Sequence, residues 1–101
     1  MTQEILLIKK GDFKSGMLSK LTAGEFHFYS DKIIFNPMGW SRIFNSAPIT
    51  ISKSSIINYS ESFTIIGYSF KLQTRMGNFT LRFMGDKLQV LNMIRSYLSS
   101  L

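Results

Sequence analysis

The sequence has no cysteine and only one histidine among its 101 residues. The missing cysteines exclude a disulfide scaffold, a thiolate metal site and a cysteine nucleophile, and His27 alone cannot form a histidine-rich metal centre. No apolar run approaches the roughly 20 residues that a membrane-spanning helix needs. The first residues, MTQEILLIKK, place their basic charges after the apolar run and offer no small-residue cleavage site, so we expect no signal peptide.

Patterns typical of catalysis are also missing. The glycines are isolated, so they form no phosphate-binding loop, and no serine stands in a G-x-S-x-G context. His27 lies two residues from Glu25, a spacing that allows a base and its orienting carboxylate. A histidine on the surface of a hairpin explains the same pattern. Asp12, Asp31 and Asp86 lie beside expected turns, where capping explains them better than metal binding. We therefore expect no catalysis, no metal and no cofactor.

Acidic residues are scarce relative to basic ones. Six Asp and Glu stand against twelve Lys and Arg, which gives a net charge of +6 and a pI near 9.8. Such a charge favours contact with phosphate-rich surfaces, although a soluble basic protein needs no such partner. The cations are scattered along the chain, so a disordered basic arm that wraps nucleic acid is not expected.

The segment Ser69–Phe83, SFKLQTRMGNFTLRF, has the pattern of a β-hairpin. Apolar residues alternate along both halves, which is typical of half-buried antiparallel strands. A two-residue turn at Met76-Gly77 would set Lys71 opposite Arg82, with Arg75 near the tip. Like charges placed opposite each other are mildly destabilising, so this basic stripe suggests an anionic or acidic partner.

Strand patterns also precede this hairpin, and a helical pattern follows it. The expected strands are Glu4–Lys10, ended by Gly11-Asp12; Phe13–Leu21, as extended chain or as the same bent edge strand after a break; Gly24–Ser30; Lys32–Asn36, stopped by Pro37; Ile49–Ser52; and Ser55–Phe63. After Gly85, with Asp86 as N-cap, apolar residues recur at helical spacing. These residues are Val90, Leu91, Ile94, Tyr97, Leu98 and Leu101.

These elements predict one domain over residues 1–101, mainly β, with about seven strands and a C-terminal helix. The helix must cover an open end or face of a bent antiparallel sheet, so the fold class is α+β. We expect Phe70, Leu72, Leu81 and Phe83 to share one core with the helix. Their helical partners would be Leu91, Ile94 and Leu98.

Three segments resemble GRAM domains and bacterial pleckstrin-homology-like (PH-like) domains. They are GEFHFYSDKIIFNP, APITISKSSIINYS and IIGYSFKLQTRMGNFTLRF, and with the terminal helix they cover Gly24–Leu101. The resemblance implies a strongly bent seven-stranded sheet, or a partly open barrel, capped by a helix. Many such domains bind phosphoinositides or other anionic lipids through basic residues between the first strands. The nearest candidates for this role are Lys9, Lys10, Lys14 and Lys20.

The irregular segment around Trp40 is a second candidate for binding. Bulky apolar groups lie beside a cation here, in Met38, Gly39, Trp40, Arg42, Ile43 and Phe44. A tryptophan next to an arginine suits a protein-binding hot spot or a membrane interface. Trp40 could equally fold back and close the open end of the barrel.

Three classes of function follow from these patterns. The favoured function is a non-catalytic module for protein–protein interaction or self-assembly. The first alternative is peripheral binding to anionic lipid, and the second is nucleic-acid binding through the basic hairpin. Tyr29, Tyr59 and Tyr68 could stack on bases, but they are not interleaved with Lys or Arg as in a dedicated platform. We infer no small-molecule substrate, and we expect a cytoplasmic protein, free or peripheral at the membrane surface.

Overall fold

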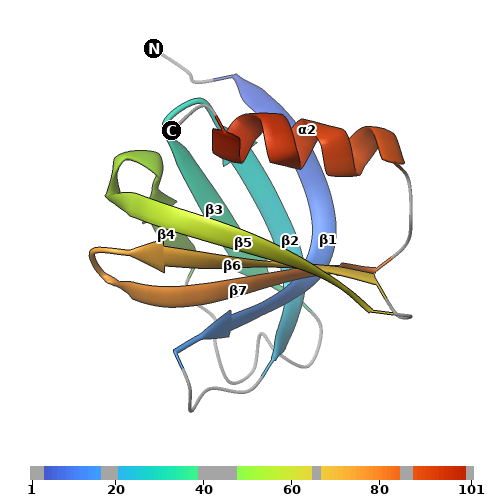
Figure 1. Ribbon diagram of the computed structural model, residues 1–101, viewed down its shortest axis with the longest axis horizontal. Helices are drawn as coiled ribbons and strands as arrows, with labels where there is room; N and C mark the ends of the chain where they lie inside the picture. Colours follow the sequence, from blue (N-terminus) through green and yellow to red (C-terminus); the bar gives the residue numbers. More distant parts are fainter. Residues whose placement is uncertain (1–3, 17–20, 39–47, 65–66, 85–87, 100–101) are drawn as a thin grey trace.

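The computed structural model describes residues 4–16, 21–38, 48–64, 67–84 and 88–99. Within these residues the chain forms one antiparallel sheet and a C-terminal helix (Figure 1). The strands are β1 (Ile5–Ser15), β2 (Thr22–Tyr29), β3 (Lys32–Pro37), β4 (Ile49–Ser52), β5 (Ile56–Thr64), β6 (Gly67–Thr74) and β7 (Gly77–Met84). A short 3-10 turn, η1 (Lys53–Ser55), precedes β5, and the helix is α2 (Leu88–Ser99). The predicted fold class is confirmed.

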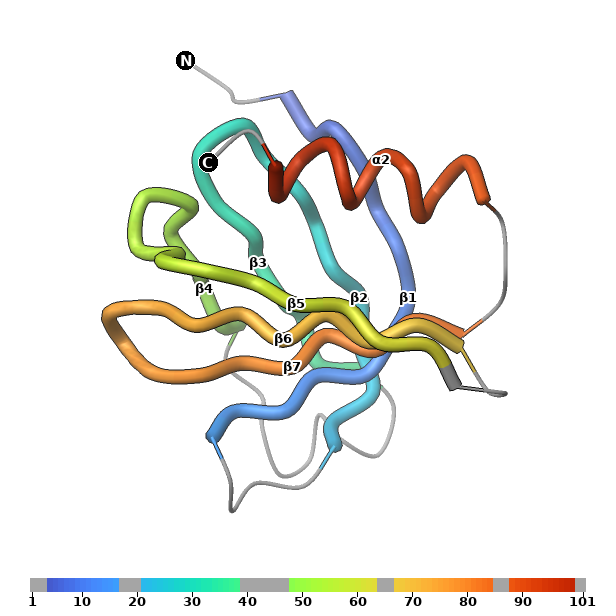
Figure 2. Tube along the Cα trace, viewed as in Figure 1, coloured from blue at the N-terminus to red at the C-terminus, as the bar shows by residue number. Residues whose placement is uncertain are grey.

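The sheet is strongly bent, and its two halves share β1. The strand order is β4-β3-β2-β1-β7-β6-β5. Figure 2 shows β5, β6 and β7 crossing in front of the β1–β4 half, with α2 lying across the upper part of β1 and β2. Between the two halves and α2 lies the core, so the helix closes one end of a partly open barrel.

The first strand differs from the prediction. The sequence predicts a strand that ends at Gly11-Asp12, followed by extended chain or by the same bent edge strand after a break; instead, β1 runs without interruption through both residues and is central in the sheet. Its residues Ile5–Phe13 pair with β2, and its residues Asp12–Ser15 pair with β7. Gly11 lies where β7 joins, and a Cβ there would stand 2.5 Å from the Arg82 carbonyl oxygen. The glycine therefore permits a close backbone approach and does not end the strand.

The hairpin of β2 and β3 agrees with the prediction. Phe26 and Phe28 are buried, whereas Glu25, His27 and Tyr29 on the alternate positions are only partly buried. The strands turn at Ser30-Asp31, and β3 ends at Pro37. Local alternation is enough to assign the faces here, because one side of each strand meets the core.

The final hairpin has the predicted faces but a different register. Its turn is centred on Arg75-Met76, so Thr74 pairs with Gly77 and Gln73 with Asn78. The Thr74 hydroxyl donates a hydrogen bond to the Gly77 carbonyl at 2.7 Å and accepts one from the Met76 amide at 3.1 Å. These side-chain bonds hold the turn one residue earlier than Met76-Gly77, which shifts each cross-strand pairing by two positions. The shift is even, so every side chain keeps its face.

One hydrophobic core joins the strands to the helix, as predicted. The expected strand residues and their three expected helical partners all belong to it. Gly85, Asp86 and Leu101 lie outside the described residues. The core consists of Phe13, Phe26, Phe28, Ile33, Phe35, Ile51, Ile56, Phe70, Leu72, Leu81, Phe83, Leu91, Ile94, Tyr97 and Leu98.

Candidate binding groove

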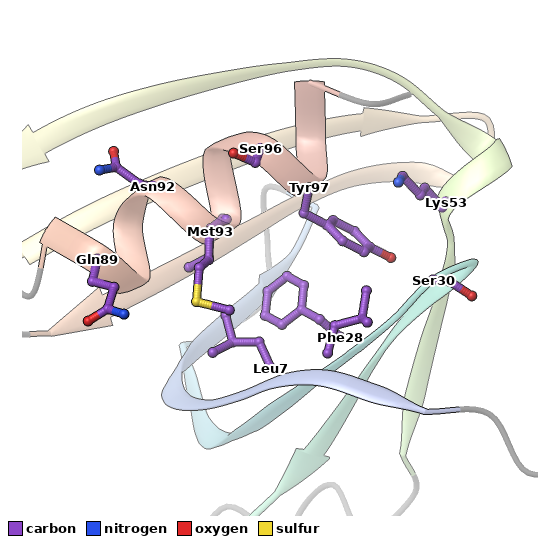
Figure 3. A pocket seen from close by; sticks show the side chains of 11 residues that line it. Leu7, Phe28, Ser30, Lys53, Gln89, Asn92, Met93, Ser96 and Tyr97 are labelled. Atoms are coloured by element: carbon purple, nitrogen blue, oxygen red, sulfur yellow. The ribbon is translucent and has the colours of Figure 1, made fainter.

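A groove of about 590 Å³ lies between α2 and the first two strands (Figure 3). Apolar side chains converge in it from three elements: Leu6 and Leu7 from β1, Phe28 from β2, and Met93 and Tyr97 from α2. Leu6 is 47% exposed and Met93 is 43% exposed, so both present apolar surface to solvent at the rim. The volume falls within the range of ordinary ligand sites, roughly 300–1,000 Å³.

The local structure of β1 explains why its apolar residues reach the groove. The register against β2 shifts between Ile5 and Leu7, so the strict alternation of sides breaks at Leu6. Leu7 is partly buried against the core, while Leu6 and Ile8 are exposed. In the apolar run Ile5–Ile8, Leu7 therefore packs against the core, and the other three side chains are exposed.

Tyr97 forms the best-fixed part of the groove. Its hydroxyl donates a hydrogen bond to the Lys32 carbonyl at 3.1 Å, and its ring meets Phe28 edge-on with centroids 5.3 Å apart. The Lys53 ammonium lies 4.3 Å from the centroid of the same ring. Burial, with a smaller contribution from Asp31, raises the pKa of Tyr97 to about 12. The hydroxyl therefore stays protonated and keeps donating at neutral pH.

The remaining groups of the groove are mostly uncharged. Ser30, Gln89, Asn92 and Ser96 surround the apolar surface, and among the described residues that line it Lys53 is the charged one. These described residues offer apolar contact and neutral hydrogen bonds, and they include no pair of groups suited to acid–base chemistry. This chemistry fits recognition of an apolar surface with a few polar groups.

His27 and Glu25 do form a pair, but away from the groove. His27 Nε2 lies 2.7 Å from Glu25 Oε1 on the outward positions of β2, and both side chains are partly exposed. Neither residue lines the groove. Across the described part of the chain, no group of three or more His, Cys, Asp or Glu residues could hold a metal ion.

The predicted basic stripe on the last hairpin is rearranged. Lys71 faces Thr80 and not Arg82, because of the shifted register. Arg82 instead donates to Asp12 of β1, with Nη2 to Oδ2 at 2.9 Å. Arg75 is exposed at the turn. The expected row of opposed cations is therefore wrong, since an acidic residue 70 positions away neutralises one of its members.

The candidate lipid-binding lysines do not form one cluster. Lys9 and Lys10 lie on the half of β1 that pairs only with β2, whereas Lys14 lies on the part that pairs with β7. Lys14 faces Thr80, on whose other side Lys71 lies. Lys20 lies outside the described residues. The structure thus places Lys14 of this set and Lys71 of the hairpin on either side of Thr80.

Only the first residue of the Trp40 segment can be placed. Met38 is exposed, and its amide donates to the Ala23 carbonyl at 3.1 Å. Gly39, Trp40, Arg42, Ile43 and Phe44 lie outside the described residues.

The three tyrosines considered for base stacking occupy different surroundings. Tyr59 and Tyr68 pack against the core. Tyr29 lies on the outward side of β2, with the Lys32 ammonium 5.4 Å from its ring centroid. The structure does not bring these three rings together on one face of the described sheet.

The groove itself was not predicted from the sequence. Helical spacing predicts Tyr97 on the apolar face of the helix, but no pattern in the sequence indicates a role for Leu6, Met93 or Lys53. One signal was present: four apolar residues in a row, Ile5–Ile8, exceed what a strand with one buried face needs. Their position beside α2 depends on the tertiary fold.

Comparison with known proteins adds information on the fold. No protein-family model and no curated protein matches the chain. Among solved structures, the chain is similar to the C-terminal domain of an unknown protein from Leishmania infantum. The TM-score is 0.70 at 14% sequence identity, and the match covers 95% of this chain and 84% of that one. The likeness is one of fold. None of the described helices is long and apolar enough to cross a membrane.

Proposed function

We propose that this chain is a non-catalytic protein-binding module on a PH-like scaffold, and that the groove between α2 and β1 receives a segment of a partner protein. The observation that carries this proposal is the exposed apolar rim of the groove, formed by Leu6 and Met93 above Phe28 and Tyr97. Apolar surface left in water has a free-energy cost, roughly 25 cal/mol per Å², which a partner removes by covering it.

The extent of the apolar surface favours a polypeptide over a small molecule. Exposed apolar surface continues beyond the groove on α2, where Leu88 is 62% exposed and does not line the groove. Ile5 and Ile8 of β1 are also exposed, but they pair with Tyr29 and His27 on the outer side of the sheet. A small ligand would fill the groove and leave Leu88 in water. A peptide segment can place an apolar anchor side chain in the groove and cover the exposed apolar surface beside it with its neighbouring residues.

The net charge favours a different protein over a second copy of the chain. Two copies would each carry +6, so their mean interaction at long range is repulsive. A partner segment with acidic residues beside its apolar anchors would be attracted instead. We therefore propose an apolar, acidic-flanked segment as the ligand.

Peptide display tests this proposal. Random peptides selected on the folded domain should share apolar anchors with neighbouring Asp or Glu. Binding of a selected peptide should weaken about tenfold or more in the double variant Leu6→Gln, Met93→Gln, because both anchors lose apolar contact. Met76→Gln is the matched control, since Met76 is 72% exposed at the tip of the last hairpin and does not line the groove. Peptides that bind the double variant as tightly as the unmodified domain would contradict the proposal.

A further inference from the structure

A row of three side chains crosses the outer face of the β1, β7 and β6 strands. Lys14 of β1 pairs with Thr80 of β7, and Thr80 pairs on its other side with Lys71 of β6. Residues directly opposite each other in neighbouring strands point to the same face. Adjacent strands are about 4.8 Å apart, so the two lysine Cα atoms are roughly 10 Å apart with the threonine hydroxyl between them.

On the side towards the hairpin turn, the neighbours of this row carry hydrogen-bonding groups without charge. A hollow of about 350 Å³ follows the β5, β6 and β7 strands, and Lys71 and Thr80 both line it. Its other polar side chains are Asn58, Ser60, Gln73 and Asn78. These groups can donate to oxygen atoms while leaving the two ammonium groups as the source of charge.

The carboxylates closest in the sheet are already engaged. Asp12 lies two residues before Lys14 on β1 and is bound to Arg82 at 2.9 Å. Glu61 follows Ser60 on β5 and is bound to Arg95 at 2.7 Å. Within the described part of the chain, neither Lys14 nor Lys71 forms an ion pair with a carboxylate. Two neighbouring cations therefore remain available for an external anion.

We propose that Lys14, Thr80 and Lys71 bind a phosphate group of a small, soluble phosphorylated molecule. A phosphate monoester carries nearly two negative charges and three acceptor oxygens, which match two ammonium groups and one hydroxyl. The hollow beside the row accommodates the rest of the ligand and supplies amide and hydroxyl groups to it. This site lies on a different face from the α2–β1 groove and does not depend on it.

The same face is poorly suited to the larger sources of phosphate. Tyr59 and Phe79 take the alternate positions, packed against the core, so they form no stacking platform for unpaired bases. Beside the row, the outward positions of β6 and β7 carry polar side chains, namely Ser69, Lys71, Gln73, Asn78, Thr80 and Arg82. The large apolar side chain on the described outward positions of these two strands is Met84, which lies at the far end of β7, four residues from Thr80. Charge and hydrogen bonding remain as the means of recognition.

Titration with inorganic pyrophosphate at low ionic strength, followed by amide NMR, tests the proposal. We expect saturable shifts centred on Lys14, Lys71 and Thr80. The double variant Lys14→Gln, Lys71→Gln should bind pyrophosphate at least about tenfold more weakly. The control Lys10→Gln, Lys32→Gln removes the same charge elsewhere and should change the affinity less than about twofold, because general attraction depends on net charge. Thr80→Val should weaken binding while keeping the shape of the side chain.

Three results would overturn this assignment. Shifts that do not saturate, or equal weakening in both double variants, would mean that only the overall charge attracts the anion. Binding to phosphatidylserine vesicles that needs Lys14 and Lys71, in a protein that does not bind pyrophosphate, would assign the row to a membrane. The same pattern with an oligonucleotide would assign it to nucleic acid. Peptide binding at the α2–β1 groove should be unchanged in Lys14→Gln, Lys71→Gln, so failure of one proposal is distinguishable from failure of the other.

Discussion

Replacing Gly11 with alanine should destabilise the fold at the point where the two halves of the sheet meet. The new Cβ would stand 2.5 Å from the Arg82 carbonyl oxygen, 3.0 Å from Phe83 Cδ1 and 3.1 Å from Phe26 Cε2. The closest of these neighbours is backbone, which cannot rotate out of the way. The β1 and β7 strands must therefore separate locally.

The size of the effect follows from two contributions. Inserting a methyl group into a packed site costs about 1–3 kcal/mol, and weakening one backbone hydrogen bond between β1 and β7 adds about 1 kcal/mol. We expect a loss of about 2–4 kcal/mol in the free energy of unfolding. Without the close approach, alanine in a strand would instead stabilise by roughly 0.5–1 kcal/mol. The sign of the change therefore tests the geometry directly.

Urea denaturation followed by circular dichroism measures this change. Lys10→Ala, on the neighbouring exposed position of β1, is the control and should lie within about 0.5 kcal/mol of the unmodified protein. Gly24→Ala should behave like Gly11→Ala, because its Cβ would meet a backbone group, the Asn36 carbonyl oxygen, and also the Phe35 ring at 2.5 Å. A Gly11→Ala midpoint equal to or above that of the unmodified chain would refute the reasoning.

Three further predictions concern the core, the helix and the histidine. Phe70→Ala or Leu91→Ala should each cost about 2–5 kcal/mol through lost burial and a residual cavity, and an unchanged denaturation midpoint in both would contradict the shared core. Because the pKa of Tyr97 is raised to about 12 in the folded protein, its hydroxyl ionises at a lower pH in the unfolded chain than in the folded one. The contribution of Tyr97 to the free energy of unfolding should be complete below about pH 10 and should fall as the pH rises towards 12. Tyr97→Phe should show a shallower alkaline loss of stability, measured by denaturation across this pH range, and an identical slope would count against the assignment. His27→Ala should leave peptide binding unchanged, because His27 and Glu25 lie outside the groove; a titration showing loss of binding in a folded variant would reverse this view.

The features that could be predicted from the sequence are those set by near neighbours. The alternation of Phe26 and Phe28 with Glu25 and His27 assigns the faces of β2 without any knowledge of the partner strand. The helical spacing of Leu91, Ile94 and Leu98 does the same for α2. Both patterns record which side of an element meets apolar surroundings.

The wrong predictions arise where the local structure depends on a contact with residues far away in the sequence, or on one or two side-chain hydrogen bonds. Gly11-Asp12 has the composition of a turn, and only the carbonyl of Arg82 shows why the glycine lies inside a strand. The hairpin register depends on two hydrogen bonds of the Thr74 hydroxyl, which alternation of apolar residues cannot indicate. Periodicity predicts the face on which a residue lies. It does not predict its cross-strand partner, because a register shift by any even number of residues keeps every side chain on the same face.

The candidate sites were the least predictable part for the same reason. Leu6 and Met93 are separated by most of the chain, and so are Lys14 and Lys71. Their proximity is created by the bend of the sheet and the position of α2. Composition indicated a basic surface, but not which of its residues would be neighbours.

The sharing of β1 between two half-sheets has a consequence for synthesis on the ribosome. The chain emerges from its amino-terminal end, so β1 to β4 can assemble while β7 is still unmade. The pairing of Asp12–Ser15 with β7 joins residues far apart in the sequence, with Asp12 and Arg82 separated by 70 positions. Contacts of such high sequence separation form slowly, because a long loop must close first. During this delay the last part of β1 exposes an unpaired edge, which can pair with another chain and so favours aggregation.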